Sequence, residues 1–170
     1  MTVTPVDPAL FAERVATILD IALHRFLDVA LLDPDEPSAG IVFPVEDAAV
    51  NNLGLLHGGV VTALLDVACY LALLPGLGAD EHAVTHDLSV SLIRAVPRGA
   101  FVQVRGHVVR RGSRIVFLRA EATVEGTVVA AAQVTKSMVG RWASRSSRRR
   151  ILPVTVLGSS SISTTWRGYL

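Results

Sequence analysis

Apolar and small residues run almost without interruption from residue 58 to residue 74, which is long enough for several turns of helix. One charged side chain, that of Asp66, interrupts this run, and Pro75 ends it. A helix that is apolar on every face must be buried in a protein core or in a membrane. A carboxylate inside such a helix is costly unless it is paired, hydrogen-bonded or used in chemistry. We therefore predict a buried helix over residues 57–74, with Asp66 as its candidate functional group.

Two further elements are predicted before this helix. Helical spacing indicates a first helix over residues 7–31, with Asp7 as its N-cap and Pro8 at its first position. Residues 40–46 are mostly apolar and predict a short strand, in which Pro44 favours an edge or a bend.

Four strands are predicted in the second half of the chain, because apolar and polar residues alternate there. Their ranges are residues 84–96, 100–111, 113–124 and 127–139. In the first of them the alternation puts Thr85 and Asp87 on the same face. The short turns between the strands imply an antiparallel meander. The pattern as a whole is α+β and predicts a curved antiparallel sheet wrapped around one apolar helix.

The length of 170 residues fits one domain with a real core. We divide the chain into an N-terminal helical segment (1–37), the helix-and-sheet domain (38–140) and a tail (141–170). The edges of so small a sheet are often closed by a second subunit, so we expect a homodimer or homotetramer.

Charge is distributed unevenly along the chain. Residues 1–140 carry 10 Lys or Arg and 15 Asp or Glu, a net charge of −5, whereas residues 141–170 carry 6 Arg and no acid, a net charge of +6. The basic run of the tail has no interleaved aromatic residues and no basic helical period, so we expect a solvated appendage and no nucleic-acid partner.

Several features favour a cytoplasmic protein outside the membrane. The first residues lack the basic start and apolar core of a signal peptide. The single cysteine, Cys69, excludes an internal disulfide and fits a reducing compartment. A charge such as that of Asp66 costs about 2.5–3.5 kcal/mol at mid-bilayer, so a core helix is preferred to a membrane span.

The start of the central helix is a second candidate for chemistry. The free N–H groups of a helix N-terminus suit a developing oxyanion, and Gly58 and Gly59 allow close approach, although they also suit a tight turn. Eight residues separate Gly58 from Asp66, which is about 12 Å along the axis. Antiparallel packing of two such helices across a dimer would bring Asp66 of one subunit near Gly58 of the other. A buried structural role for Asp66 is the alternative.

The spacing of these residues resembles that of the hotdog-fold acyl-CoA thioesterases over about residues 38–140. The resemblance is closest to the phenylacetate-degradation type, within the 4-hydroxybenzoyl-CoA thioesterase superfamily. The motifs that carry it are Asn51-x-x-Gly54-x-x-His57-Gly58-Gly59, Asp66, Val84-Thr85-x-Asp87-Leu88 and Arg110-x-Gly112.

The resemblance implies a hotdog fold and hydrolysis of the thioester of a small or medium acyl- or aryl-CoA. It implies that Asp66 acts as the general base or nucleophile and that the Gly58 N–H polarises the thioester carbonyl. Asn51 and His57 correspond to polar residues at the thioester and at the helix start. Thr85 corresponds to a hydroxyl residue that positions water from the neighbouring subunit.

The resemblance also implies a site for coenzyme A, which is part of the substrate, so that no separate cofactor is expected. The turn that meets the nucleotide and its phosphates comprises Arg110, Arg111, Gly112, Ser113 and Arg114. Neighbouring positions are Asp87, Arg94 and Lys136. Arginine suits this task because its guanidinium gives forked contacts to phosphate.

The sequence departs from the family at two places. The Arg-Pro pair that often ends the first long strand is replaced by Arg94-Ala95-Val96-Pro97, with the proline two places late. Around the acyl pocket, where many relatives have a polar or aromatic residue, the predicted lining indicates an apolar acyl group. That lining comprises Val67, Cys69, Tyr70 and Leu73.

Other kinds of site are not expected. A possible ligand cluster comprises Asp80, His82, His86 and Asp87. His82 and His86 could share a strand face, but a zinc or iron site needs another convergent ligand, and we predict no metal. Cys69 lacks a basic neighbour and is not expected to be a nucleophile. A hotdog hydratase is expected to carry His five residues after the catalytic Asp, where this chain has Leu71. A non-catalytic acyl-CoA-binding or regulatory hotdog domain remains the alternative to an enzyme.

Overall fold

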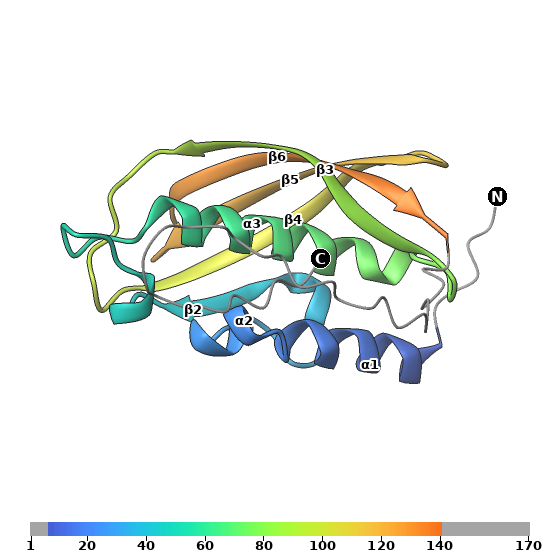
Figure 1. The fold of residues 1–170 in the computed structure, drawn as a ribbon, viewed down its shortest axis with the longest axis horizontal. Coiled ribbons are helices and arrows are strands. Elements are labelled where there is room, and N and C mark those ends of the chain that lie inside the picture. Colours follow the sequence, from blue (N-terminus) through green and yellow to red (C-terminus); the bar gives the residue numbers. More distant parts are fainter. Residues whose placement is uncertain (1–6, 141–170) are drawn as a thin grey trace, which may run out of the picture.

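One curved sheet and one long helix dominate the fold (Figure 1). The computed structural model describes residues 7–140. The helices are α1 (Pro8–Leu19), α2 (Ala22–Phe26) and α3 (Gly58–Leu73), with 3-10 turns η1 (Pro37–Ala39), η2 (Asp47–Ala49) and η3 (Leu74–Gly76). The strands are β1 (Ala30–Leu31), β2 (Ile41–Pro44), β3 (His82–Leu92), β4 (Phe101–Arg111), β5 (Ile115–Val124) and β6 (Thr127–Val139). The predicted tail over residues 141–170 lies outside the described residues.

The sheet is antiparallel throughout, with strand order β1-β2-β4-β5-β6-β3. The predicted meander is correct for β4, β5 and β6 but wrong for β3, which pairs with β6 at the opposite edge from β1. The link over residues 93–100 explains this difference. The N–H of Leu56 donates to the Val96 carbonyl at 2.8 Å, so the link is tied to the loop before α3. It carries the chain past the start of α3 to the place of β4 beside β2.

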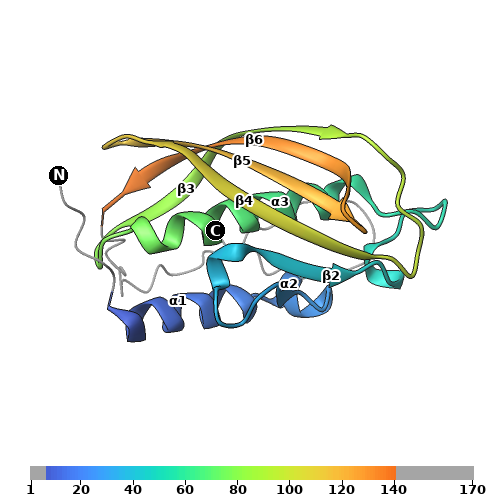
Figure 2. The ribbon, with the colours of Figure 1, turned by 180° about the vertical axis from the view of Figure 1, so that it is seen from behind.

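Helix α3 lies in the concave side of the sheet in both ribbon views (Figures 1 and 2). Its residues Leu64, Leu65 and Leu71 are fully buried. At Gly106 in β4 a Cβ atom would lie 2.4 Å from the backbone carbonyl of Ala68, so only glycine lets the strand approach the helix this closely. The predicted buried helix and the α+β hotdog fold are therefore confirmed.

The segment Gly58–Gly76 is also long and apolar enough to cross a membrane, with a mean hydropathy of 1.8. The core helix of a soluble protein meets the same criterion of length and composition. The packing of α3 against the sheet explains its apolar composition without a membrane.

The first predicted helix is correct at its start, but it is not continuous over residues 7–31: α1 ends at Leu19 and a short second helix, α2, covers Ala22–Phe26. The Asp7 side chain accepts a hydrogen bond from Ala9 N–H at 2.7 Å, and Pro8 occupies the first turn. The chain then turns at Ile21, whose backbone is extended, and again at Asp28, whose φ of 51° is left-handed. Residues 30–31 pair with β2 instead of continuing the helix. Tertiary pairing overrides the local helical period here.

Strand positions follow the alternation closely. The predicted strand 127–139 is confirmed at both ends, and β3 ends at Leu92, four residues before the predicted end. Glu125 and Gly126 form the hairpin turn, with φ values of 47° and 77°. Both positive angles suit the primed turns that connect twisted strands.

The side chain of Arg14 fixes α1 to the loop before β3. Its Nη2 donates to the carbonyls of Gly78, Ala79 and Glu81 at 3.2, 2.8 and 3.1 Å. The Glu81 carboxylate in turn accepts a hydrogen bond from Gly78 N–H at 2.8 Å and pairs with Arg111 at 2.5 Å. The Gly78 hydrogen bond first, and then Arg111, hold the pKa of Glu81 below its usual value.

This arrangement predicts a loss of stability in acid. A carboxylate whose folded-state pKa is lowered stabilises the fold above its ordinary pKa of 4.5, and this contribution is lost as the pH falls through the folded pKa. Between about pH 7 and about pH 3, the melting temperature of wild type should therefore fall further than that of Glu81→Gln. Glu121→Gln, at an exposed position of β5, is the matched control. Equal acid sensitivity of wild type and Glu81→Gln would contradict this account.

Candidate active site

Asp66 lies in the middle of α3, and residues from β3 and β6 hold its side chain. Thr85 Oγ1 donates a hydrogen bond to Asp66 Oδ1 at 2.7 Å. Lys136 Nζ donates to the same oxygen at 2.7 Å and to Thr85 Oγ1 at 2.9 Å. The three side chains thus form a closed hydrogen-bonded group around one carboxylate oxygen, and all three belong to the same chain.

A bulge in β3 brings Thr85 to this group. The register with β6 pairs Thr85 with Lys136 and Asp87 with Thr135, so His86 is the extra residue between them. The bulge turns Thr85 toward α3 and leaves Asp87 exposed on the opposite face. The prediction that Thr85 and Asp87 share a face is therefore wrong, because simple alternation does not anticipate an inserted residue.

Lys136 is the only lysine of the chain, and its side chain is 2% exposed. The Nζ atom also lies 5.6 Å from the centre of the Tyr70 ring, within reach of a cation–π contact. The sequence placed Lys136 among the coenzyme A-binding positions, whereas the structure places it against Asp66. The available signal was the alternation of β6, in which Lys136 is in phase with the buried Ala132 and Val134.

A cavity of about 730 Å³ opens beside Asp66, and we call it the Asp66 cavity. One wall comes from a single face of α3 and comprises Ala63, Asp66, Val67 and Tyr70. A second wall comes from β3 and β6, including Ala83, Thr85, Leu88, Lys136 and Val139. A third comes from α1 and α2 and comprises Ile18, Ile21 and His24. Polar groups thus gather at Asp66, and apolar side chains line much of the rest.

The predicted acyl-pocket lining is partly correct. Val67 and Tyr70 line the Asp66 cavity, whereas Cys69 and Leu73 are buried in the core. Burial raises the pKa of the Cys69 thiol to about 12, so the thiolate that a nucleophile requires is not formed near neutral pH.

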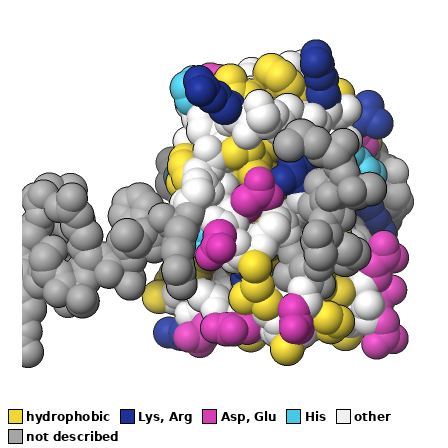
Figure 3. Space-filling model, turned by 90° about the vertical axis from the view of Figure 1, so that its right-hand side faces the viewer, with side chains coloured by type: hydrophobic (Ala, Val, Ile, Leu, Met, Phe, Trp, Pro, Cys, Tyr) yellow, Lys and Arg dark blue, Asp and Glu magenta, His cyan; other side chains and the backbone are white. Residues whose placement is uncertain are grey.

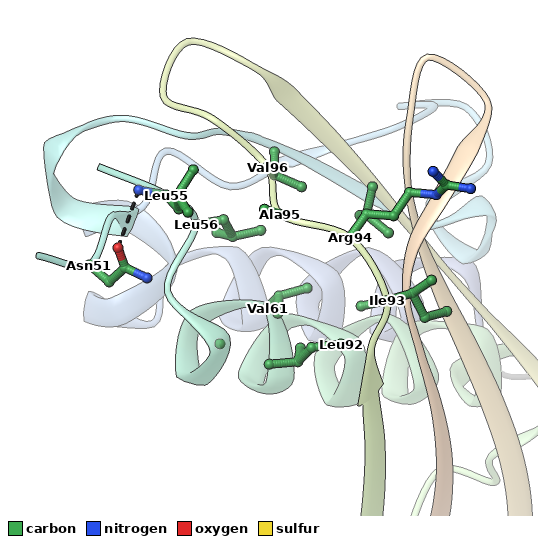
Figure 4. Close-up of a pocket in the computed structure, with 12 residues that line it drawn as sticks. Asn51, Leu55, Leu56, Val61, Leu92, Ile93, Arg94, Ala95 and Val96 are labelled. Atoms are coloured by element: carbon green, nitrogen blue, oxygen red, sulfur yellow. Dashed lines mark hydrogen bonds between the residues drawn. The ribbon is translucent and has the colours of Figure 1, made fainter. Parts of the chain in front are cut away.

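Gly58 and Asn51 line a separate pocket of about 220 Å³ at the start of α3 (Figure 4). The pocket is otherwise mostly apolar, with Leu56, Val61 and Leu92 among its walls. The Asn51 side chain accepts hydrogen bonds from the N–H groups of Leu53 and Leu55 at 2.9 and 3.3 Å, which shape the loop before the helix. We call this the Gly58 pocket; it shares no lining residue with the Asp66 cavity.

His57 prepares the start of α3 by acting as its N-cap. Its Nδ1 accepts a hydrogen bond from Gly59 N–H at 2.9 Å. The Gly58 N–H makes no hydrogen bond to another described residue and is available to a ligand. The space beside Gly58 is narrow, since a Cβ there would lie 2.7 Å from Leu92 Cδ1. The Gly58 N–H is therefore a free hydrogen-bond donor at the N-terminus of α3.

The residues of the predicted coenzyme-binding turn differ in their contacts and in their exposure to solvent. Arg111 is engaged with Glu81 and is only partly exposed. Gly112 N–H donates to the Ile115 carbonyl at 2.9 Å, which closes the turn. Arg110, Ser113 and Arg114 are exposed. Figure 3 shows the end of the molecule that includes this turn, where most Lys and Arg side chains gather on the upper part and most acidic side chains on the lower part.

The remaining predicted residues do not join Asp66 in this chain. Arg94 lines the Gly58 pocket, and its guanidinium extends away from Asn51 (Figure 4). Asp87 lies on the outer face of the sheet, as its register with Thr135 shows. Within residues 7–140 no three His, Cys, Asp or Glu side chains are grouped to hold a metal ion.

The family model for the thioesterase superfamily matches residues 53–131, which include α3, Thr85 and the arginine turn. Residues 53–131 are therefore similar to the thioesterase superfamily. This match and the names of the curated relatives bear out the predicted class of enzyme, a hydrolase of thioester bonds.

Two curated proteins are also similar in sequence to this chain. The protein SSO2140 of Saccharolobus solfataricus, which is named as an esterase, is 27% identical over 115 residues, covering 68% of this chain and 80% of that protein. Acyl-coenzyme A thioesterase 13 of Mus musculus is 27% identical over 97 residues, covering 55% of this chain and 68% of that protein.

Solved structures share the fold. The thioesterase HI1161 of Haemophilus influenzae superposes with a TM-score of 0.68 at 20% identity, covering 78% of this chain and 93% of that one. The protein BH2602 of Bacillus halodurans, solved with CoA, gives a TM-score of 0.64 at 17% identity, covering 76% and 88% of the two chains.

Proposed function

We propose that this protein hydrolyses the thioester of a small or medium acyl- or aryl-coenzyme A. The observation that carries the proposal is the Asp66 carboxylate, held by Thr85 and Lys136 at the wall of a large cavity. A carboxylate fixed in one orientation beside an open cavity is suited to take a proton from water. The names of the mouse relative and of the CoA-bound Bacillus halodurans structure support coenzyme A as the carrier of the acyl group.

In the proposed reaction Asp66 acts as the general base. Its Oδ1 accepts both described hydrogen bonds, and Oδ2 makes none to a described residue. As Oδ2 takes a proton from water, the water oxygen attacks the thioester carbonyl carbon and a tetrahedral oxyanion forms. The C–S bond then breaks, and the proton passes from Asp66 to the departing coenzyme A thiolate. The products are the free acid and coenzyme A.

We propose that a second copy of the chain completes the site. The Gly58 N–H is free to stabilise the oxyanion, but it lies in a separate pocket about 12 Å along α3 from Asp66. Strand β3 is an edge strand, and its end exposes Leu92 and Ile93. Two antiparallel copies joined along β3 would bring Gly58 of one copy toward Asp66 of the other.

We place the nucleotide of coenzyme A against the exposed side chains of the β4–β5 turn. Arg110 and Arg114 are free of the ion pair that occupies Arg111 and can contact phosphate groups.

A thiol-release assay over a panel of aliphatic and aryl acyl-CoAs tests the proposal. We expect release of free coenzyme A from at least one class of acyl-CoA, at a rate proportional to protein concentration. Binding of acyl-CoA without release across the whole panel would instead favour a non-catalytic binding domain.

A further inference from the structure

The third wall of the Asp66 cavity contains a polar group that the proposed chemistry does not use. This wall belongs to α1 and α2, which run along the same side of α3 in both ribbon views (Figures 1 and 2) and precede the residues matched by the family model. Its members are Ile18, Ile21 and His24. His24 is only 5% exposed, so its hydrogen bonding matters for the fold and for any ligand in the cavity.

One ring nitrogen of His24 serves the fold. Helix α1 ends at Leu19, and the carbonyls of its last turn need partners. The Nδ1 atom of His24 lies 2.6 Å from the Ile18 carbonyl oxygen. A carbonyl can only accept, so Nδ1 carries the hydrogen and donates it. In the neutral ring Nε2 is then a hydrogen-bond acceptor.

The other ring nitrogen is open to a ligand. Nε2 makes no hydrogen bond to a described residue. Among residues 7–140, the fully buried side-chain nitrogens and oxygens without a partner are the Nη1 atoms of Arg14 and Arg111. Nε2 of His24 is not one of them. The open space that His24 borders is the Asp66 cavity.

We propose that His24 is a specificity-determining residue whose Nε2 accepts a hydrogen bond from a hydroxyl group on the distal part of the acyl chain. This inference rests on the proposed thioesterase function, because it takes the acyl group to lie in the cavity beside Asp66. The apolar side chains of Ile18, Ile21, Val67 and Leu88 surround the carbon skeleton. An acyl group without a hydroxyl would cover Nε2 and leave it unpaired, which discriminates against that substrate.

Matched pairs of substrates test this assignment. Hexanoyl-CoA is compared with 6-hydroxyhexanoyl-CoA, and phenylacetyl-CoA with 4-hydroxyphenylacetyl-CoA. We expect wild type to favour the hydroxylated member of at least one pair by about 10-fold to 100-fold in kcat/KM. No preference for the hydroxylated member in either pair would overturn the assignment.

Two variants distinguish the roles of the two ring nitrogens of His24. In His24→Asn the side-chain amide nitrogen can replace Nδ1 at the Ile18 carbonyl, while nothing replaces Nε2. In His24→Gln the amide reaches the position of Nε2 and offers an acceptor there. We expect His24→Asn to lose the preference, so that both members of a pair are hydrolysed with similar kcat/KM, and His24→Gln to keep part of it. A preference unchanged in His24→Asn would also overturn the assignment.

Binding measurements keep this test distinct from that of the proposed function. Calorimetric titration of Asp66→Asn with each member of a pair gives a ratio of Kd values that does not depend on turnover. If no acyl-CoA is hydrolysed by wild type, the proposed function fails, whereas the Kd ratio still supports or refutes the role of His24.

Discussion

Replacing Asp66 with Asn is expected to lower kcat for acyl-CoA hydrolysis by about 10³-fold or more, because the amide cannot take the proton of the attacking water. The substitution should change substrate binding much less, since the amide oxygen can still accept hydrogen bonds from Thr85 and Lys136. Thiol release and calorimetric binding of the same acyl-CoA measure the two effects separately.

The choice of asparagine follows from the buried ammonium beside Asp66. Asp66→Ala would leave Lys136, which is 2% exposed, without its partner, and an unpaired buried charge destabilises a fold by about 3–5 kcal/mol. Activity lost in Asp66→Ala could therefore reflect unfolding. Asp35→Asn makes the same chemical change at an exposed turn position and serves as the control, with wild-type turnover expected. If Asp66→Asn turned over acyl-CoA about as fast as Asp35→Asn, this result would contradict the proposed mechanism.

The sequence was sufficient for the features that depend on local pattern. The apolar run around Asp66 predicted α3, and alternation predicted β6 at both ends. The capping of α1 by Asp7 followed from residue types alone. Each of these features is decided by neighbours along the chain, so periodicity and capping preferences describe them well.

Features that depend on distant contacts were predicted less well. Alternation does not say which strand lies beside which, and β3 pairs along its length with β6, more than 30 residues away in the sequence. The bulge at His86 reverses the face of Thr85, and no residue preference announces it. Arg111 was predicted to contact phosphate because its ion-pair partner, Glu81, is 30 residues away in the sequence and local pattern does not reveal the pair.

The candidate site was predicted by residue type more than by arrangement. The sequence identified Asp66 and Thr85 but assigned Thr85 to a neighbouring subunit and Lys136 to the coenzyme. Within the chain, Thr85 and Lys136 both contact the Asp66 carboxylate. A lysine on an inward-facing strand position is informative because burial of its charge demands a partner, and Asp66 is the carboxylate within reach.

Lys136 therefore provides the second large expected effect. Replacing it with Met keeps a similar length and removes the charge, so Asp66 retains only Thr85. Breaking a buried pair typically costs about 3–5 kcal/mol, and water reaches the Asp66 side chain, which is 30% exposed. We expect the free energy of unfolding to fall by about 2–3 kcal/mol and kcat to fall by about 10-fold to 100-fold, because the carboxylate is no longer held in one orientation. Chemical denaturation and thiol release measure these changes.

A double-mutant cycle distinguishes this pairing from a general packing role for Lys136. In Asp66→Asn/Lys136→Met both charges are absent, so the unpaired carboxylate that destabilises Lys136→Met is removed. The double variant should therefore be more stable than the sum of the two single changes predicts, with a coupling free energy of about 1–3 kcal/mol. Because the chain has a single lysine, labelling with ¹⁵N-lysine also gives one ammonium signal, and this signal should shift in Asp66→Asn. Strictly additive stabilities and an unmoved ammonium signal would together show that Lys136 fills space without holding Asp66.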